Sequence, residues 1–446
     1  MKKITITFLT LLIAIAGIAQ DIAGSWNGKL GPLRVVLNIQ KSDTGYNVTL
    51  DSPDQGAKGI PVSEFTYNNP DIHLKIDAVH AAYTGEYKTD SLTGTFTQGS
   101  KTLPLTFVRG FVEPVKHPQE PTLPLPYYSE EVTFEDTQAH VTLAGTLTLP
   151  RKTGSYPAVI LITGSGQQNR DEELLGHKPF LIISDYLTRQ GIAVLRYDDR
   201  GVAKSTGDFK SATSLDFAND VESAIAYLKT RKEIKQIGLI GHSEGGLIAP
   251  IVAARNKNVA FIVMLAGTGI RGDELLLKQT ALVLHAQGTA DSAITKINTT
   301  NKGAFDIILN NDDDSTIKRD LTSYYKQLGE GNPEEEVKEM MHPWPWIKFF
   351  MKYDPTTSLR KVHCPVLAVN GDKDLQVPAK DNLPKIAAAL KEAGNKDATI
   401  KEYEGLNHLF QECKTGSPTE YARIEQTFSP LVLEEITKWI KIRTVH

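Results

Sequence analysis

The sequence predicts an α/β protein whose mostly parallel sheet is covered by helices on both faces, with a helical cap insertion and a small all-β domain in front. Short strand-like segments separated by turn residues fill the chain up to about residue 109. From residue 128 onward, continuous apolar runs alternate with amphipathic stretches, a pattern typical of buried parallel strands and their covering helices. This alternation stops between Gly267 and Cys364, where only helical patterns remain.

The bulk composition excludes some classes of partner. The 446 residues include 49 Lys and Arg against 53 Asp and Glu, which gives a formal net charge of −4. Charge is therefore near balance, and no basic run is present, so a nucleic-acid partner is not expected. The length suits two or three domains.

Residues 1–19 have the pattern of a cleavable secretory signal peptide. Lys2 and Lys3 provide a positive start, residues 4–16 form a short apolar run, and small residues lead up to Ala19. The apolar run is too short to span a bilayer. We expect cleavage after Ala19, a secreted or periplasmic location, and no stable membrane anchor.

Residues 20–109 predict an all-β accessory domain with a barrel- or sandwich-like sheet, because short strands recur at regular spacing. One of these strands is expected at 62–67. Residues 110–127 predict a stiff, extended linker, since proline restricts the backbone. The linker prolines are Pro114, Pro118, Pro121, Pro124 and Pro126.

Residues 128–446 predict the larger, catalytic domain. Ligands of such sheets bind at the carboxyl ends of the strands. The predicted strands include 144–149, 157–163, 193–198, 237–241, 261–267, 365–370 and 399–403. The predicted helices outside the cap are 179–190, 215–229, 247–254, 383–392 and 427–443.

The helical cap is predicted at about residues 270–360. Its expected helices cover 273–287, 292–308, 315–328 and 334–341. We interpret the acidic runs 312–314 and 334–336 as a solvated loop and a helix start rather than a calcium site. The aromatic run that closes the cap either packs it onto the core or lines an apolar substrate cleft. Its candidate substrate-binding residues are Trp344, Trp346 and Phe350.

The clearest motif is Gly241-His242-Ser243-Glu244-Gly245. An apolar strand pattern precedes it and a helical pattern of small residues follows it, which is the context of a nucleophile elbow. At such a turn the serine occupies a strained backbone position, and the flanking glycines avoid collisions with the neighbouring strand and helix. Ser243 is therefore the candidate nucleophile.

A serine nucleophile needs a histidine base, and the histidine needs a carboxylate to orient it. The chain order serine, acid, histidine is met by Ser243, Asp374 and His408, each just beyond a predicted strand. Asp372 is the alternative acid, although the position of Asp374 ahead of Val377-Pro378 favours Asp374. His242, next to the nucleophile, is interpreted as structural.

The negative oxygen of a tetrahedral intermediate needs backbone donors already in place. We expect these from the N–H of Glu244 and from the loop after the strand 157–163, with Ser165 favoured and Gly166 as the alternative. Paired histidines at zinc-binding spacing are absent from the sequence, so neither a metal nor a cofactor is expected.

Residues 128–446 resemble the α/β-hydrolases, and most of all the secreted bacterial carboxylesterases of the EstD type and their prolyl-aminopeptidase-like relatives. The matching segments are 163–166, 170–172, 196–201, 241–245, 365–374 and 407–408. Thr163 departs from the family pattern, in which a histidine often opens the oxyanion loop. The resemblance implies hydrolysis of short-chain carboxylic esters without a cofactor.

The sequence therefore predicts a secreted serine carboxylesterase acting on a small-molecule ester. A second interpretation is that the protein is a peptidase of the same fold. It would need an acidic cluster for the substrate amine, and Glu330, Glu339 or residues 334–336 in the cap could supply one. Thioester or lactone hydrolysis is a third reading. A binding protein on an inactive hydrolase frame is disfavoured by the intact set of serine, acid and histidine.

Overall fold

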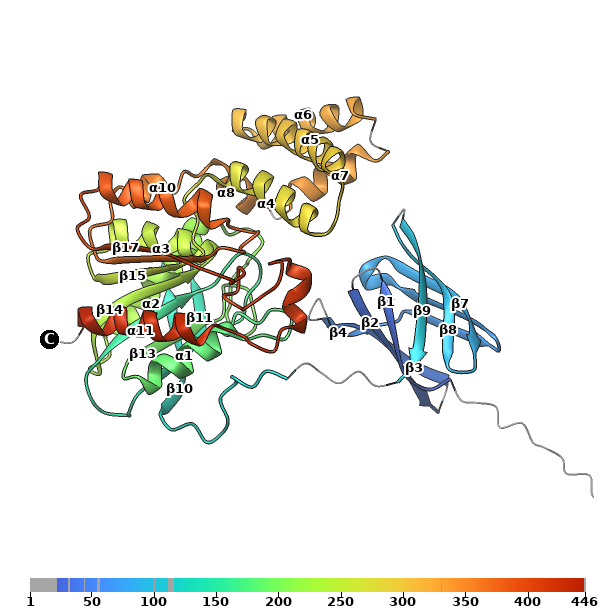
Figure 1. The fold of residues 1–446 in the computed structure, drawn as a ribbon, viewed down its shortest axis with the longest axis horizontal. Helices are drawn as coiled ribbons and strands as arrows, with labels where there is room; N and C mark the ends of the chain where they lie inside the picture. The colour runs from blue at the N-terminus through green and yellow to red at the C-terminus, as the bar shows by residue number, and fades with distance from the viewer. Residues whose placement is uncertain are drawn as a thin grey trace, which may run out of the picture. The chain divides into compact units, whose positions relative to one another are not determined.

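The computed structural model of the protein describes residues 22–30, 33–43, 45–53, 57–99, 101–110, 116–329, 331–342 and 344–444. The predicted signal peptide lies outside these residues. The chain divides into two compact units, Met1–Glu113 and Pro114–His446, so the division falls within the predicted linker. Figure 1 shows the two units, with the all-β unit in blue and the larger unit running from cyan to red.

The first unit is a single antiparallel sheet of nine strands in the order β4-β3-β2-β1-β9-β8-β7-β6-β5. One face of this sheet is apolar, as in β6, where exposed and buried residues alternate. Trp26 is fully buried in this core and donates from Nε1 to the carbonyl of Ile22 at 2.9 Å. The strands are β1 Gly24–Leu30, β2 Leu33–Ser42, β3 Gly45–Ser52, β4 Ala57–Pro61, β5 Glu64–Asn68, β6 Asp71–Ile76, β7 Ala81–Lys88, β8 Ser91–Gln98 and β9 Lys101–Arg109.

One strand of the first unit was not predicted from the sequence. The strand expected at 62–67 corresponds to β5, which begins at Glu64, whereas β4, which ends at Pro61, was not predicted. These two strands lie at opposite edges of the sheet order. The chain therefore leaves one edge of the sheet and begins the other at this point, which periodicity within a short segment does not reveal.

The second unit contains an eight-stranded sheet in the order β10-β11-β13-β12-β14-β15-β16-β17. β10, β11 and β13 pair antiparallel, and the strands from β13 through β17 are parallel to one another. The strands are β10 Tyr128–Asp136, β11 Val141–Leu149, β12 Tyr156–Ile162, β13 Ala193–Tyr197, β14 Ile234–His242, β15 Val259–Leu265, β16 Val366–Gly371 and β17 Ala398–Tyr403.

Helices cover both faces of this sheet, which is why its central strands are buried along almost their whole length. Residues of α2, α3 and α10 share one apolar core with the sheet, and residues of α1 and α11 share the other. These helices are α1 Pro179–Arg189, α2 Ser214–Lys229, α3 Glu244–Arg255, α10 Ala379–Glu392 and α11 Pro430–Thr444. α10 begins ahead of its predicted start at Leu383 and carries Pro384 inside the helix.

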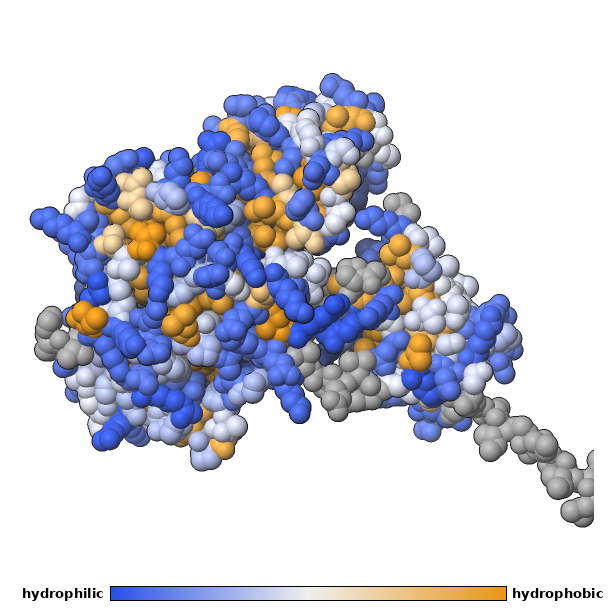
Figure 2. Space-filling view, in the orientation of Figure 1, coloured by the Kyte–Doolittle hydropathy of each residue, from blue (hydrophilic) through white to orange (hydrophobic). Residues whose placement is uncertain are grey.

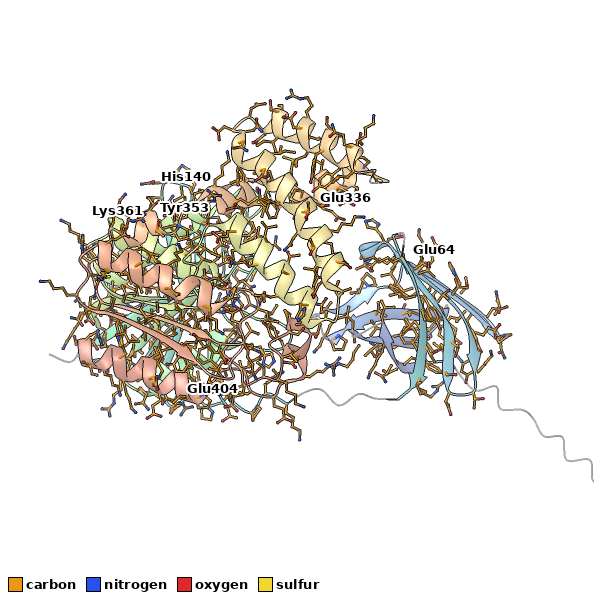
Figure 3. The ribbon with its side chains drawn as sticks, turned by 45° about the horizontal axis from the view of Figure 1, so that its top comes forward. Glu64, His140, Glu336, Tyr353, Lys361 and Glu404 are labelled. Carbon is orange, nitrogen blue, oxygen red and sulfur yellow. The ribbon has the colours of Figure 1, made fainter. Side chains whose placement is uncertain are left out.

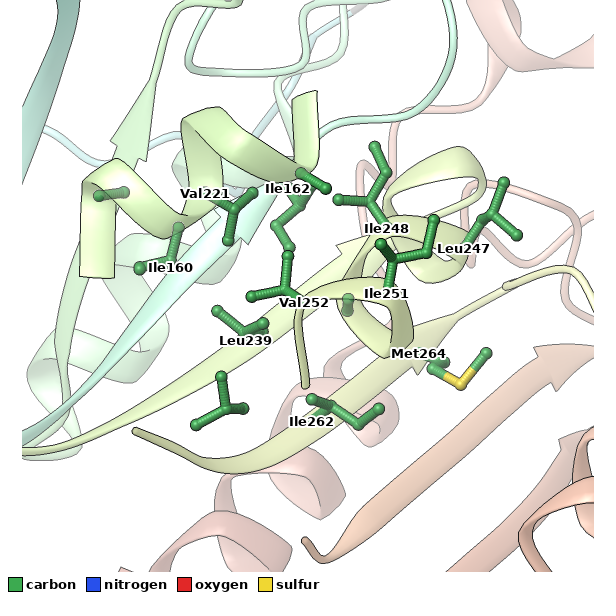
Figure 4. Packing of buried hydrophobic residues seen from close by; sticks show 14 of the residues in the cluster. Ile160, Ile162, Val221, Leu239, Leu247, Ile248, Ile251, Val252, Ile262 and Met264 are labelled. Atoms are coloured by element: carbon green, nitrogen blue, oxygen red, sulfur yellow. The ribbon is translucent and has the colours of Figure 1, made fainter. Parts of the chain in front are cut away.

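Helix α3 packs closely against the centre of the sheet. Figure 4 shows Ile248 and Val252 of α3 among side chains from β12, β14 and β15. Side chains of this size contribute about 1.5–3 kcal/mol each when fully buried. This packing holds the first turn of α3 in place at the carboxyl end of β14.

The insertion between β15 and β16 is helical. Its helices are α4 Gly272–Ala286, α5 Asp291–Asn310, α6 Asp314–Gln327, α7 Pro333–Met340, α8 Trp346–Lys352 and α9 Thr356–Leu359. The cap has an apolar core of its own, which includes Phe305, Leu321 and Met351. Figure 2 shows hydrophobic residues gathered over the cap among the hydrophilic ones. Where the chain returns toward the sheet of the second unit, Tyr353, which is labelled in Figure 3, lies just after α8. Its ring stacks on that of Phe349 with centroids 5.1 Å apart.

The acidic runs of the cap have ordinary structural roles. Asp313 caps α6 by accepting the N–H of Thr316 at 2.8 Å, and Asp312 pairs with Lys352 at 2.6 Å. Residues 334–336 form the first turn of α7, where negative charge suits the helix dipole. Among the residues that the structure describes, no cluster of acidic, histidine or cysteine side chains could hold a metal ion. Within the same residues, no helix is both long and apolar enough to cross a bilayer.

Candidate active site

Ser243 lies at a sharp turn between β14 and α3, with φ 54° and ψ −114°. Positive φ is uncommon for a residue with a side chain. The backbone N–H of Ser243 donates to the carbonyl of Leu265 at 2.8 Å, which fixes this conformation. A Cβ on Gly241 would lie 1.9 Å from the carbonyl oxygen of Gly245, and a Cβ on Gly245 would lie 2.1 Å from that of Ile162. The turn therefore requires glycine at both positions.

Asp374 and His408 are brought together as the sequence predicts. The Nδ1 atom of His408 lies 2.8 Å from Oδ2 of Asp374, and both side chains are buried. The other carboxylate oxygen of Asp374 accepts the backbone N–H groups of Gln376 and Val377, each at 2.8 Å. These donors orient the carboxylate toward Nδ1 of His408, which leaves Nε2 as the ring nitrogen that makes no hydrogen bond to this acid.

The alternative acid, Asp372, has another role. Its Oδ1 accepts the backbone N–H of Gly405 at 2.6 Å and so closes the turn after β17. The hydrogen bond to the ring of His408 comes from Asp374 instead. The geometry thus distinguishes between the two candidate acids, a choice that the sequence had left open.

Ser243, Asp374 and His408 follow the carboxyl ends of β14, β16 and β17, which lie at the same edge of the sheet. The ring of His242, which directly precedes the serine, has its centroid 4.8 Å from that of His408. Within the described residues, no hydrogen bond joins the hydroxyl of Ser243 to His408. Contacts of this kind often tighten only when substrate is bound.

The predicted oxyanion donors lie on two segments next to Ser243. Glu244 is the first residue of α3, so its N–H lies at the positive end of that helix. In the loop after β12, a Cβ on Gly164 would lie 3.3 Å from Cβ of Ser243, which puts this loop directly beside the serine. Ser165 and Gly166 follow on the exposed part of the loop. The N–H of Gly164 is already used, because it donates to Oε1 of Glu172 at 2.7 Å.

Thr163, which departs from the family pattern, holds the beginning of this loop in place. Its hydroxyl donates to Oδ1 of Asp199 at 2.7 Å, and the other oxygen of Asp199 accepts the N–H of Gln168 at 3.1 Å. Burial raises the pKa of Asp199 well above its ordinary value, despite these donors. The hydroxyl of Thr163 and this aspartate therefore tie the beginning of the loop to the end of β13.

The side chain of Glu244 points away from solvent. Its Oε1 accepts the hydroxyl of Ser214 at 2.6 Å and the indole N–H of Trp346 at 2.7 Å. Burial raises the pKa of Glu244, and these two donors oppose that rise. Because Trp346 belongs to α8, this hydrogen bond joins the cap to the residue that follows Ser243.

The three aromatic residues predicted to bind substrate all have packing partners. Trp344 donates from Nε1 to Asp314 at 2.9 Å, within the cap. Trp346 stacks on Phe350 with ring centroids 5.0 Å apart, and Phe350 is buried against the backbone of Gly272. The structure thus supports the packing role for these residues, and a role in substrate binding stays a prediction.

His242 and Glu172, near Ser243, form contacts that the sequence did not reveal. Nδ1 of His242 lies 2.9 Å from Oε1 of Glu172, and its Nε2 lies 2.9 Å from the backbone carbonyl oxygen of His408. Burial lowers the pKa of His242, but the charge of Glu172 and both hydrogen bonds outweigh it, so the net shift is upward. The segment 170–172 was a recognisable sequence signal, although its partner could not be read from it.

Comparisons with known proteins agree with this description of the second unit. The family described as serine aminopeptidase, S33, matches residues 180–412, more than half of the chain. Esterase EstD of Thermotoga maritima is 28% identical over 319 residues, which cover 71% of this chain and 70% of that protein.

Solved structures that the chain matches include an esterase, Est1E and a proline iminopeptidase. An esterase of Pyrococcus furiosus matches with a TM-score of 0.45 and 16% identity, over 72% of this chain and 91% of its own. Est1E of Butyrivibrio proteoclasticus, with ferulic acid bound, matches with a TM-score of 0.44 and 17% identity, over 71% of this chain and 100% of its own. A proline iminopeptidase of Mycobacterium smegmatis matches with a TM-score of 0.43 and 13% identity, over 70% of this chain and 98% of its own.

The predicted α/β-hydrolase fold, the preceding all-β unit and the resemblance to EstD-type esterases are confirmed. The chain belongs to the serine aminopeptidase S33 family of serine hydrolases with the α/β-hydrolase fold.

Proposed function

We propose that the protein is a serine carboxylesterase that hydrolyses small, short-chain carboxylic esters with Ser243 as nucleophile, His408 as general base and Asp374 as the orienting acid. The observation that carries this proposal is the 2.8 Å hydrogen bond between Asp374 and His408 at the sheet edge where the strained Ser243 turns into α3. A named esterase among the relatives supports ester substrates.

In the first half of the reaction, the hydroxyl oxygen of Ser243 attacks the ester carbonyl carbon while Nε2 of His408 takes the hydroxyl proton. The carboxylate of Asp374 stabilises the imidazolium that results. Negative charge develops on the carbonyl oxygen, and the backbone N–H groups of Glu244 and Ser165 are the proposed donors to it. His408 then returns the proton to the leaving alkoxide oxygen, which departs as an alcohol.

In the second half, water attacks the acyl-enzyme, His408 accepts one proton from that water, and the carboxylic acid leaves as Ser243 regains its hydrogen. The proposed chemistry needs no metal, since the base and the donors are all protein groups.

The surroundings of Ser243 favour a neutral ester over a substrate with a free amine. Glu172 and Glu244 both lie on segments next to Ser243, both are buried, and one carboxylate oxygen of each accepts two hydrogen bonds from protein donors. A peptidase acting on free N-termini needs an acidic group available to the substrate ammonium.

The proposal is tested by labelling with a fluorophosphonate probe and by a substrate panel. We expect the wild type to be labelled, Ser243→Ala to remain unlabelled, and p-nitrophenyl acetate and butyrate to be cleaved faster than longer esters or aminoacyl anilides. Cleavage of anilides without cleavage of esters would show that the protein is a peptidase instead. Failure of the wild type to react with the probe would refute a serine hydrolase mechanism.

We also propose that the protein is exported and loses residues 1–19, on the evidence of the amino-terminal sequence pattern alone. Cell fractionation and amino-terminal sequencing of the mature protein test this, with Gln20 expected as the first residue. Recovery of the intact chain from the cytoplasm would contradict it.

A further inference from the structure

The carboxyl group of Glu172 lies between two of the loops that form the candidate active site. Its Oε1 accepts the N–H of Gly164 from the proposed oxyanion loop at 2.7 Å. The same oxygen lies 2.9 Å from Nδ1 of His242, the residue before the nucleophile. One carboxylate oxygen therefore connects the loop after β12 with the end of β14.

His242 extends this connection to a third loop. Its Nε2 lies 2.9 Å from the backbone carbonyl oxygen of His408. A carbonyl oxygen only accepts hydrogen bonds, so Nε2 of His242 must carry a hydrogen. Nδ1 makes the second hydrogen bond of the ring, with Oε1 of Glu172, so both ring nitrogens of His242 are held in place.

The pair is shielded from water. Glu172 and His242 are 4% and 6% exposed, and the space beside them is lined by Phe180, Ile183 and Phe428 among other apolar side chains. In such surroundings hydrogen bonds are stronger than in water and their geometry is well defined. Glu172 also has a positive φ of 51°, a backbone conformation that persists only where its surroundings enforce it.

We propose that Glu172 is a positioning residue for the proposed ester hydrolysis, acting through His242 on the backbone of His408 and directly on Gly164 of the oxyanion loop. It holds the general base and the oxyanion donors at fixed positions relative to Ser243 without touching the substrate. This inference rests on the proposed function, since it assigns positions to groups that the reaction uses.

The proposal makes a kinetic distinction. Loss of the carboxylate leaves substrate contacts in place but lets the loop of His408 and the loop of Gly164 move relative to Ser243. Misplacement of reacting groups by about 1 Å costs about 100-fold in rate. The chemical step should therefore slow while substrate binding changes little. A residue that only stabilises the fold would lower the melting temperature and leave the rate per folded molecule unchanged.

The test compares Glu172→Ala, Glu172→Gln and the control Asp220→Asn. Asp220 is a buried carboxylate as well, but its partner is Arg200, at 2.7 Å, and it contacts none of the three loops through its hydrogen bonds. For each protein, kcat and KM on p-nitrophenyl butyrate, the rate constant of fluorophosphonate labelling and the melting temperature are measured, below the melting temperature of every variant.

We expect Glu172→Ala to lower kcat and the labelling rate constant by about 100-fold, with KM little changed. Glu172→Gln should lie between Ala and wild type, because its amide oxygen still accepts the N–H of Gly164. Asp220→Asn should lower the melting temperature while kcat stays near wild type. His242→Gln, which breaks the same connection from its other side, should reproduce the kinetic loss.

Two results would overturn the inference. One is a Glu172→Ala protein that labels and turns over at the wild-type rate, whatever its melting temperature. The other is an equal loss of kcat in Asp220→Asn, which would indicate a general effect of destabilisation. Failure of the proposed function looks different, because the wild type itself would then cleave no ester. The labelling rates of the variants would still test the positioning of Ser243 and His408 in that case.

Discussion

The indole N–H of Trp346 donates to Oε1 of Glu244 at 2.7 Å. Trp346 opens α8 of the cap, and Glu244 opens α3 directly after Ser243, so the hydrogen bond joins two residues that are 102 positions apart in the chain. The hydroxyl of Ser214, from the start of α2, donates to the same oxygen. The cap is thereby attached to the helix whose first N–H is a proposed oxyanion donor.

Trp346→Phe removes this hydrogen bond and keeps most of the stacking on Phe350. We expect stability to fall by about 1 kcal/mol, because a buried acceptor loses one of its two donors. Release of α8 should also weaken the preference for short acyl chains. The measurements are urea unfolding and the ratio of kcat/KM for p-nitrophenyl acetate to that for the octanoate. Trp344→Phe is the matched control, since its indole bonds to Asp314 within the cap. An unchanged acyl preference in Trp346→Phe would contradict a role for this contact in selectivity.

Asp374→Asn preserves the shape of the acid and removes its charge. We expect kcat to fall by about 10³- to 10⁴-fold, since a neutral amide neither fixes the tautomer of His408 nor stabilises its charged form. Asp372→Asn should stay near wild type, because Asp372 bonds to the backbone of Gly405. Ester hydrolysis under saturating substrate provides the measurement. Equal losses in the two variants would overturn the assignment of the acid.

Gly245→Ala should destabilise the protein by at least about 3 kcal/mol. Its Cβ would lie 2.1 Å from the carbonyl oxygen of Ile162, and neither backbone segment can move without disturbing the sheet. Gly331→Ala is the control: no atom lies within 4 Å of its Cβ position, and its stability should change by less than about 0.5 kcal/mol. Denaturant unfolding of both variants checks this. A Gly245→Ala protein of wild-type stability would show that the turn relaxes.

We predict that protonation of His177 lowers the free energy of unfolding in acid. Burial lowers its pKa from 6.5 to about 4, and its ring bonds to Thr427 at 3.0 Å and to the carbonyl of Tyr421 at 2.8 Å. The unfolded chain therefore takes up this proton at a higher pH than the folded protein does. As pH falls from about 6.5 to about 4, folding should lose about 3 kcal/mol through this group, with no further loss below that range.

The check for His177 is urea unfolding of wild type and His177→Gln across this pH range. Glutamine does not titrate, so the stability difference between wild type and variant should shrink as pH is lowered toward 4. Above pH 7 the difference should be constant. A difference independent of pH would show that His177 does not stay neutral in the folded protein.

Much of the candidate site could be predicted because its signals are local. Strand periodicity, the glycines around Ser243, and the positions of Asp374 and His408 just after strands each depend on a few neighbouring residues. The parallel arrangement of the sheet then brings those strand ends to one edge. The same reasoning missed β4 and the early start of α10, where the course of the chain outweighs the short-range pattern.

The sequence by itself determined the α/β-hydrolase fold, the nucleophile elbow, and the residue types of the serine, acid and histidine set, since each follows from backbone geometry or spacing within a short segment. Only the tertiary structure decided between Asp374 and Asp372, paired Glu172 with His242 across 70 positions, and directed Trp346 toward Glu244. The physical reason is that these contacts depend on where separate loops lie after folding. Hydrogen bonds form over about 3 Å, and no local pattern specifies loop positions to that distance.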